Sequence, residues 1–322
     1  MHTVRHGERG TKMSEDRRDG NIPVLFVSGT TLPEGWEKSV LAVWEKGGRY
    51  PTEYDHEGEP PSLDATMTLV IEKPFEEPRL HRAFPGAIED LEKYRLEVVE
   101  GVHDHWIRPE EGKWTYTYHK RLFDYQVQED LASGGESPFA GVAQMDYLVE
   151  KLARVPYSRR AQAITWMPTL DPKTDDPPCL QRIWCRLAEG GDGQLYLNMN
   201  THWRSRDAYK AAFMNIYALT DLQRLLAERI SERMGRPVHV GRYVDITDSY
   251  HIYGSYLEEV EERFLRSIRE RSFEQRTWRS DNPIIRAGTQ RGREQIEQER
   301  LSLIHISEPT RPSKSSRMPS SA

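Results

Sequence analysis

The pentapeptide Pro177-Pro178-Cys179-Leu180-Gln181 contains one of only two cysteines in a chain of 322 residues. Two prolines precede the thiol and an apolar run follows it at 183–187, which predicts a turn that leads into a buried strand. A thiol at such a point can act as a nucleophile if a neighbouring positive charge lowers its pKa. Taken alone, the pentapeptide favours a small buried hydrophobic side chain, so the surrounding residues have to decide between the two roles.

Two arginine-rich segments offer sites for an anion. Arg159 and Arg160 stand at the head of a predicted strand, and paired guanidinium groups match the oxygens of a phosphate; a solvated strand end is the alternative. Arg204-Ser205-Arg206-Asp207 comes just before a predicted helix, where backbone N–H groups favour anions. Asp207 can also cap that helix, and the two roles are compatible.

Two further polar positions stand out. Asn215 lies within the apolar helical stretch 213–216, and its carboxamide presents a donor beside an acceptor, which suits the edge of uracil or cytosine. His251 and Tyr253 are two residues apart, so they face the same side of an extended chain. They could bind sugar hydroxyls or form the polar face of a strand.

The elements that position these residues alternate without a strict βαβ order, and the sequence has no glycine-rich phosphate loop. This order predicts an α+β fold rather than a doubly wound sheet. The patterns predict strands at 22–27, 66–71, 161–166 and 237–246, a hairpin of 180–187 with 194–199, and helices at 33–46, 87–99, 145–152, 208–234 and 256–270.

Two details within these elements bear on the site. Cys185 lies six residues beyond Cys179, so on a regular strand both thiols would face the same side, and we expect Cys185 in the core. The segment 105–125 is dense in aromatic side chains, which indicates either core or a stacking surface for a flat ligand.

Composition narrows the class of protein. The net charge of -6 supplies no overall basic field for nucleic acid, so none is expected as a partner. Two cysteines without CxxC spacing argue against a metal site or a disulfide framework and fit a reducing compartment. The apolar run 22–27 is too short for a signal peptide or a membrane span, so we expect a cytoplasmic protein.

The chain divides into four parts by composition. Residues 1–20 are predicted to be a disordered extension, 21–280 a catalytic domain, and 281–300 a poorly defined segment. Residues 301–322 resemble translated sequencing-adapter read-through, so we expect them not to be native and exclude them from the fold argument.

Taken in order, these motifs resemble those of the thymidylate synthase family. Five segments match its pattern in sequence, namely Ser158-Arg159-Arg160, Pro178-Cys179, Arg204-Ser205-Arg206-Asp207, Asn215 and His251-Ile252-Tyr253. The resemblance covers residues 140–260 well and the earlier part loosely. It implies the family's fold, a mixed twisted sheet packed with long helices.

The resemblance also implies a chemistry for the thiol. Cys179 would add to C6 of a pyrimidine nucleotide and make C5 a nucleophile towards methylenetetrahydrofolate. Arg204 would touch the phosphate and stabilise the thiolate, and Ser205 would also hold phosphate. Arg159 and Arg160 would reach the site from the other subunit of a homodimer.

The remaining roles concern the base, the sugar and the folate. Asn215 would bind the base edge, and His251 with Tyr253 the ribose. Asp207 would contact the folate pterin. Tyr118 resembles the family tyrosine that helps to remove the proton from C5.

The sequence also departs from the family pattern. Leu180 stands where a histidine usually follows the cysteine, and the segment 54–61 lacks the family's N-terminal phosphate arginine. Glu97 is the candidate for the glutamate that orders catalytic water, with Glu100 as its rival. The chain is similar to the shorter archaeal-type branch.

Three functions are compatible with these residues. The first is reductive methylation of dUMP to dTMP with methylenetetrahydrofolate. The second uses the same attack on dUMP or dCMP, but water replaces hydride and a hydroxymethyl group results; Asn215 favours uracil without deciding between the two. The third is a non-catalytic nucleotide- or nucleic-acid-binding relative, which the run 202–206 permits and the net charge and Cys179 disfavour.

Overall fold

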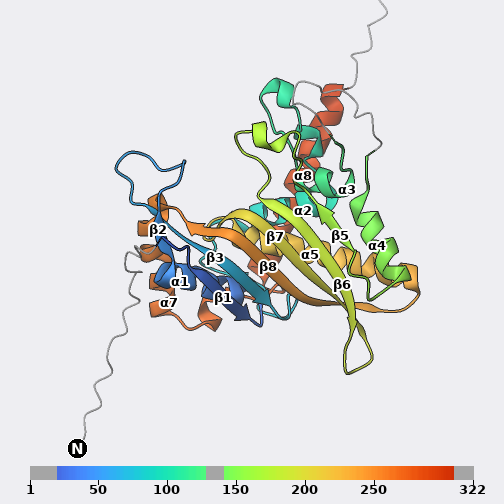
Figure 1. The fold of residues 1–322 in the computed structure, drawn as a ribbon, viewed down its shortest axis with the longest axis horizontal. Helices are drawn as coiled ribbons and strands as arrows, with labels where there is room; N and C mark the ends of the chain where they lie inside the picture. Colours follow the sequence, from blue (N-terminus) through green and yellow to red (C-terminus); the bar gives the residue numbers. More distant parts are fainter. Residues whose placement is uncertain (1–19, 128–140, 308–322) are drawn as a thin grey trace, which may run out of the picture.

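The computed structural model describes residues 20–127 and 141–307, and within them a seven-stranded sheet forms the centre of the molecule (Figure 1). The strand order is β1-β3-β8-β7-β6-β5, and β2 pairs with β3 beside this path. The strands are β1 (Val24–Gly29), β2 (Gly48–Tyr50), β3 (Ser62–Ile71), β5 (Gln162–Ile164), β6 (Leu180–Glu189), β7 (Leu195–Asp207) and β8 (Val238–Ile252).

The sheet is mixed, as the resemblance to the thymidylate synthase family implied. β1 runs parallel to β3, and β7 runs parallel to β8, whereas the other pairs are antiparallel. The predicted hairpin is β6–β7, and its turn contains Gly193 with φ of 74°, a left-handed conformation that glycine adopts without steric cost. The fold-class prediction is confirmed.

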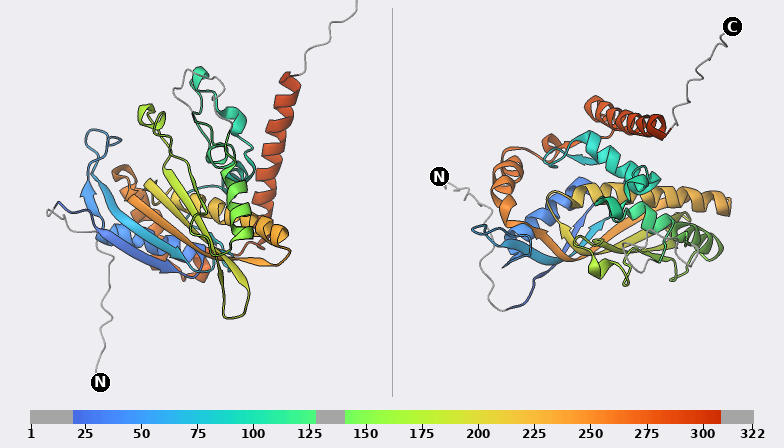
Figure 2. Two further views of the ribbon diagram at one scale, coloured as in Figure 1. Left: turned by 45° about the vertical axis from the view of Figure 1, so that its right-hand side comes forward. Right: turned by 90° about the horizontal axis from the view of Figure 1, so that it is seen from above.

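Helices are layered on one face of the sheet (Figure 2). α1 (Leu32–Lys46) packs against β1 and β3, and α5 (Ala212–Met234) packs against β7 and β8. α2 (Ile88–Glu100) lies on α5, and α8 (Pro283–Ser307) lies on α2. The smaller elements are α3 (Tyr118–Phe123), α4 (Gln144–Arg154), α6 (Leu257–Glu259), a π-helix (Val260–Leu265), α7 (Arg266–Glu270) and the ribbon of β4 (Leu80–His81) with β9 (Thr277–Trp278).

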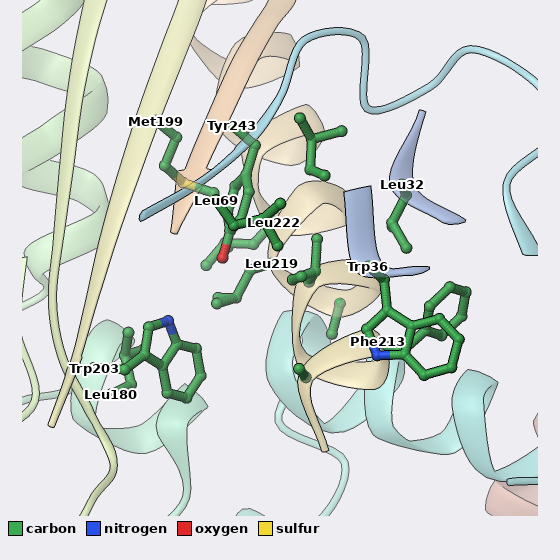
Figure 3. Packing of buried hydrophobic residues seen from close by; sticks show 14 of the residues in the cluster. Leu32, Trp36, Leu69, Leu180, Met199, Trp203, Phe213, Leu219, Leu222 and Tyr243 are labelled. Atoms are coloured by element: carbon green, nitrogen blue, oxygen red, sulfur yellow. The ribbon is translucent and has the colours of Figure 1, made fainter. Parts of the chain in front are cut away.

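The core lies between the sheet and α5 (Figure 3). The labelled side chains of this contact are fully or almost fully buried and come from β3, β6, β7, β8, α1 and α5: Leu69, Leu180, Met199, Trp203, Tyr243, Leu32, Trp36, Phe213, Leu219 and Leu222. Burial of each such side chain contributes about 1.5–3 kcal/mol. Trp36 also donates a hydrogen bond from Nε1 to the carbonyl of Ala208 at 2.9 Å, which joins α1 to the chain that leaves β7.

The C-terminal segment differs from the prediction. Residues 281–300 were expected to be poorly defined because apolar residues are sparse there, but the structure contains α8 from Pro283 to Ser307. Two isoleucines, Ile285 and Ile296, are buried, and ion pairs from Arg291 and Arg293 to glutamates of α2 hold the polar helix in place. The predictions for residues 1–19 and 308–322 lie outside the described residues.

A β-bulge changes the expected relation between the two thiols. Leu180 pairs with Trp203 but Arg182 pairs with His202, so β6 contains an extra residue at this point. Leu180 and Ile183, which are three residues apart, are consequently both buried. The regular alternation that would have put both cysteines on one face is therefore broken, whereas Cys185 is in the core as expected.

The other face of the sheet is open. Paired residues on neighbouring strands form one row across it: Phe26, Thr68, Ile246, His202, Arg182 and Ile164. None of the six side chains is buried, and Phe26 is 70% exposed. In the part of the chain that the structure describes, no helix is both long and apolar enough to cross a membrane.

Candidate active site

Cys179 is the last residue before β6, and Arg204 of β7 anchors the loop that carries it. The backbone N–H of Arg204 donates to the carbonyl of Cys179 at 2.9 Å. Its guanidinium donates from Nε to the Pro178 carbonyl at 3.1 Å and from Nη2 to the Pro177 carbonyl at 2.5 Å. One arginine therefore fixes the three residues that end in the thiol.

Burial dominates the electrostatics of this thiol. Removal from water raises the pKa of Cys179, Asp176 raises it further, and the positive charges of Arg204 and Arg206 oppose the effect without cancelling it. The free protein therefore holds Cys179 mainly as a thiol.

Tyr118 lies directly beside the cysteine. It is the first residue of α3, whose N-cap residue Thr117 accepts a hydrogen bond from the backbone of Lys120 at 3.0 Å. The Tyr118 hydroxyl accepts from the backbone N–H of Leu180 at 3.2 Å, and burial raises its pKa. This hydroxyl is therefore a protonated group next to the backbone of Cys179.

A buried ion pair holds the cysteine loop against α3. Arg121 donates from Nη2 to Asp171 Oδ1 at 2.7 Å and from Nη1 to the Thr165 carbonyl at 2.8 Å. Asp171 also accepts from the backbone N–H of Met167 at 2.6 Å. Because both charges are buried and paired, the positions of Tyr118 and of the loop are coupled.

A cavity of about 540 Å³ opens next to Tyr118. Its lining residues come from α2, from the aromatic segment before α3 and from the loop before Cys179: Tyr94, Glu97, Lys113, Trp114, Thr115, Tyr116, Thr117, Tyr118, Lys173, Thr174, Asp175 and Asp176. The aromatic segment 105–125 thus supplies a cavity wall. Glu97 lines this cavity and contacts His103 Nδ1 at 2.8 Å, whereas Glu100 is exposed and lines no part of it.

Asn215 lies in the first turns of α5 and is half-buried. Its Nδ2 donates to the hydroxyl of Tyr94 at 2.6 Å. Tyr94 was not among the predicted site residues. The signal that could have found it is the spacing of Tyr94 and Glu97, which are three residues apart and so share a face of the predicted helix 87–99.

Three other predicted residues, Ser205, Asp207 and His251, lie where β7 and β8 run parallel. Ser205 is level with Ser249, and Asp207 is level with His251. Asp207 accepts hydrogen bonds from the backbone N–H groups of Tyr209 and Lys210, both at 2.9 Å, so it caps the turn before α5. Burial raises the pKa of Asp207 to about 6.

His251 is buried beside Tyr253, with ring centroids 4.5 Å apart. Burial lowers the pKa of His251 to about 4, and its Nε2 has no hydrogen-bond partner among the described residues. Burial also raises the pKa of Tyr253 to about 12, with further contributions from Asp207, Tyr54 and Cys179. The charges of Asp207 and Cys179 thus both act on Tyr253, whose ring contacts that of His251.

Arg159 and Arg160 lie apart from these residues. Both are exposed and precede β5, where Gln162 is level with Trp184 of β6. At about 3.3 Å per residue, Arg160 is therefore roughly 20 Å from Cys179 along the sheet. These two arginines therefore lie outside the site formed by the other predicted residues.

The comparisons with known proteins cover all of these residues. A sequence profile described as Thymidylate synthase matches residues 87–281, which is more than half of the chain. The chain belongs to the thymidylate synthase family. Every predicted site residue, and Tyr94, falls within the matched range.

Relatives named "Putative thymidylate synthase" come from methanogenic archaea, in agreement with the similarity to the archaeal-type branch. The protein of Methanosarcina acetivorans is 25% identical over 228 residues, which are 71% of this chain and 89% of that protein. The protein of Methanocaldococcus jannaschii is 31% identical over 169 residues, which are 50% of this chain and 67% of that protein.

The solved structure of thermostable thymidylate synthase A from Bacillus subtilis has the same fold. The two chains superpose with a TM-score of 0.50 at 19% identity, and the match covers 73% of this chain and 84% of that one. Membership of the thymidylate synthase family supports a one-carbon transfer enzyme that acts at C5 of a pyrimidine. Within residues 20–127 and 141–307, no three His, Cys, Asp or Glu side chains gather as metal ligands.

Proposed function

We propose that the protein catalyses the reductive methylation of dUMP to dTMP, with methylenetetrahydrofolate as the one-carbon donor. The observation that carries this proposal is the hydroxyl of Tyr118 at 3.2 Å from the backbone N–H that follows Cys179, at the edge of an aromatic cavity. A proton-handling hydroxyl and the loop that leads to the thiol thereby border a space for a flat heterocycle.

Cys179 begins the reaction. Its sulfur adds to C6 of the pyrimidine, and the electron pair of the 5,6 double bond moves towards C5 and the oxygen at C4. The thiol proton has to leave first, and Arg204 and Arg206 supply the positive charge that favours this loss. Once the folate had supplied the carbon, Tyr118 would help to remove the proton from C5. Once the folate had also supplied the hydride, the sulfur would leave C6 as the 5,6 double bond re-forms.

The site has the residue types that a folate requires. When bound, methylenetetrahydrofolate would supply both the carbon and the hydride. Trp114 and Tyr116 line the cavity and offer stacking surfaces for a flat ring. Asp207, which is buried near Tyr253, would accept hydrogen bonds from the pterin.

The rest of the nucleotide would be held by the remaining predicted residues. Asn215 would bind the base edge, His251 and Tyr253 the ribose, and Ser205 with Arg204 the phosphate. Glu97 lines the cavity and would order water there. Burial keeps His251 neutral at neutral pH, so it can donate one hydrogen bond and accept another at a sugar hydroxyl.

We also propose that the active form is a homodimer in which Arg159 and Arg160 enter the partner's site. Two observations support this. The arginines are exposed and about 20 Å from the thiol of their own subunit. The open face of the sheet also exposes apolar side chains, including Val24 at 78% and Phe26 at 70%, which a second copy would bury.

Mass spectrometry of products tests the reaction. Purified protein is incubated with dUMP or dCMP and methylenetetrahydrofolate, and Cys179→Ser serves as the control. A mass gain of one methyl group on dUMP, absent in the Cys179→Ser variant, is the expected result. A hydroxymethyl product would favour hydration over hydride transfer, and turnover by the Cys179→Ser variant would eliminate the covalent mechanism.

A further inference from the structure

Tyr94 lies between the cavity next to Tyr118 and the side chain of Asn215. Its ring comes from α2 and lines the cavity that also contains Tyr118. Its hydroxyl accepts a hydrogen bond from Nδ2 of Asn215 at 2.6 Å. The two side chains therefore form a pair that joins α2 to α5 at the wall of the cavity.

The direction of this hydrogen bond determines what Tyr94 can offer to a ligand. Because its oxygen accepts from Asn215, the phenolic proton is directed away from Asn215. Burial holds the pKa of Tyr94 well above its usual value, so the proton stays on the oxygen. Because Tyr94 lines the cavity, its hydroxyl can donate to an occupant, and Asn215 keeps a second N–H beside this hydroxyl.

Two adjacent donors distinguish one pyrimidine from the other. Uracil has an oxygen at C4, which accepts hydrogen bonds, and its N3–H donates to the amide oxygen of Asn215. Cytosine has an amino group at C4, which donates and therefore opposes both donors. A site whose polar groups remain unpaired against the wrong ligand rejects it strongly.

We propose that Tyr94 is a specificity-determining residue that donates to the oxygen at C4 of the base and, with Asn215, selects uracil over cytosine. The inference rests on the proposed function, since it assumes that Asn215 binds the base edge. The same hydrogen bond would stabilise the negative charge that develops on that oxygen when Cys179 adds to C6.

Equilibrium binding of dUMP and dCMP by calorimetry, without folate, tests the proposal. Tyr94→Phe retains the ring and removes only the hydroxyl. We expect dUMP affinity to fall about tenfold and dCMP affinity to stay the same or rise, because the donor that opposes the cytosine amino group is gone, so that the preference for dUMP over dCMP decreases. Tyr217→Phe is the matched control, because this tyrosine of α5 is also packed against the core but lines no part of the cavity.

The outcomes separate the two proposals. Equal losses for both nucleotides, or no change in either, would overturn the role of Tyr94 while leaving the function intact. Failure of the wild-type protein to bind either nucleotide would reject the proposed function itself, and the inference with it. If Tyr94→Phe does not fold, the wild-type protein can be tested with 4-thio-dUMP, whose sulfur at C4 is a poor hydrogen-bond acceptor. The wild-type protein should bind dUMP about tenfold more tightly than 4-thio-dUMP. Equal binding of the two nucleotides would overturn the proposal.

Discussion

At the scale of single residues, the thiol of Cys179 combines a nucleophilic position with an unfavourable environment for its anion. Burial raises the pKa of Cys179, and Arg204 limits the increase. In a Cys185→Ser background, which leaves one cysteine, we expect the rate of iodoacetamide labelling to rise with pH around a midpoint above the ordinary value of about 8.5. Arg204→Ala should move this midpoint further up.

Because Arg204 also anchors the loop, its charge has to be separated from its hydrogen bonds. Arg204→Lys retains the charge and loses the guanidinium contacts with Pro177 and Pro178. This variant should keep a midpoint closer to that of the wild type than Arg204→Ala does. A midpoint below that of an ordinary thiol in the wild type would contradict the effect of burial.

His251 makes stability depend on pH. Its pKa falls from 6.5 to about 4 on folding because burial disfavours the charged ring. The unfolded chain therefore binds more protons between these values, so this contribution is present above pH 6.5 and is lost as pH falls towards 4. When the pH falls from 6.5 to 4, the free energy of unfolding of His251→Gln, measured by urea denaturation, should decrease by about 3 kcal/mol less than that of the wild type.

Asp207 should affect the pH dependence of stability in the direction opposite to His251. Its pKa rises from 3.8 to about 6 on folding, so its contribution is lost as pH rises between these values. Asp207→Asn should therefore lose more stability than the wild type when the pH falls. If His251→Gln and Asp207→Asn changed the pH dependence of the free energy of unfolding in the same direction, burial could not be the cause of both pKa shifts.

At the scale of elements, α8 adds a layer behind the helix that supports the site. It packs on α2, which carries Tyr94 and Glu97, and it lies beyond the range matched by the family profile. Ile285 is 3% exposed, whereas its neighbour Ile284 is 60% exposed. We expect Ile285→Ala to lower the free energy of unfolding by about 2–4 kcal/mol, as measured by urea denaturation.

Ile284→Ala is the matched control for this helix. It removes the same atoms from the exposed side, so its effect should stay below about 0.5 kcal/mol. Equal effects of the two substitutions would show that α8 does not pack on α2 in solution.

At the scale of the whole molecule, the proposed homodimer with shared sites can be tested by mixing two inactive variants. If the site is shared, Cys179→Ser and Arg159→Ala/Arg160→Ala should each be inactive as homodimers. After unfolding and refolding together, half of the dimers would be mixed, and each would contain one intact site. Activity should therefore return to about a quarter of the wild-type value.

Ultracentrifugation of the mixture is the control, since it measures how much dimer forms. Activity that stays at background while dimers form would mean that the arginines do not reach the partner's site. A monomer that is fully active would reject the shared site altogether.

Sequence alone determined the features that depend on local order. Alternation and turn residues predicted the β6–β7 hairpin, helical periodicity predicted α1, α2 and α5, and the order of Cys179, Asn215 and His251 predicted the family. These signals are readable because strands and helices impose periods of two and 3.6 residues, and because the chemistry requires certain side chains in a certain order.

The tertiary structure decided what depends on contacts between distant segments. A bulge at Leu180 separated the two thiols, pairing of α8 with α2 ordered a segment that has few apolar residues, and the crossing of α2 with α5 brought Tyr94 to Asn215. None of these contacts produces a periodic pattern in the local sequence, because the two partners lie far apart in the chain. For the same reason, the pKa of Cys179 follows mainly from its burial in the fold, which the sequence around it does not reveal.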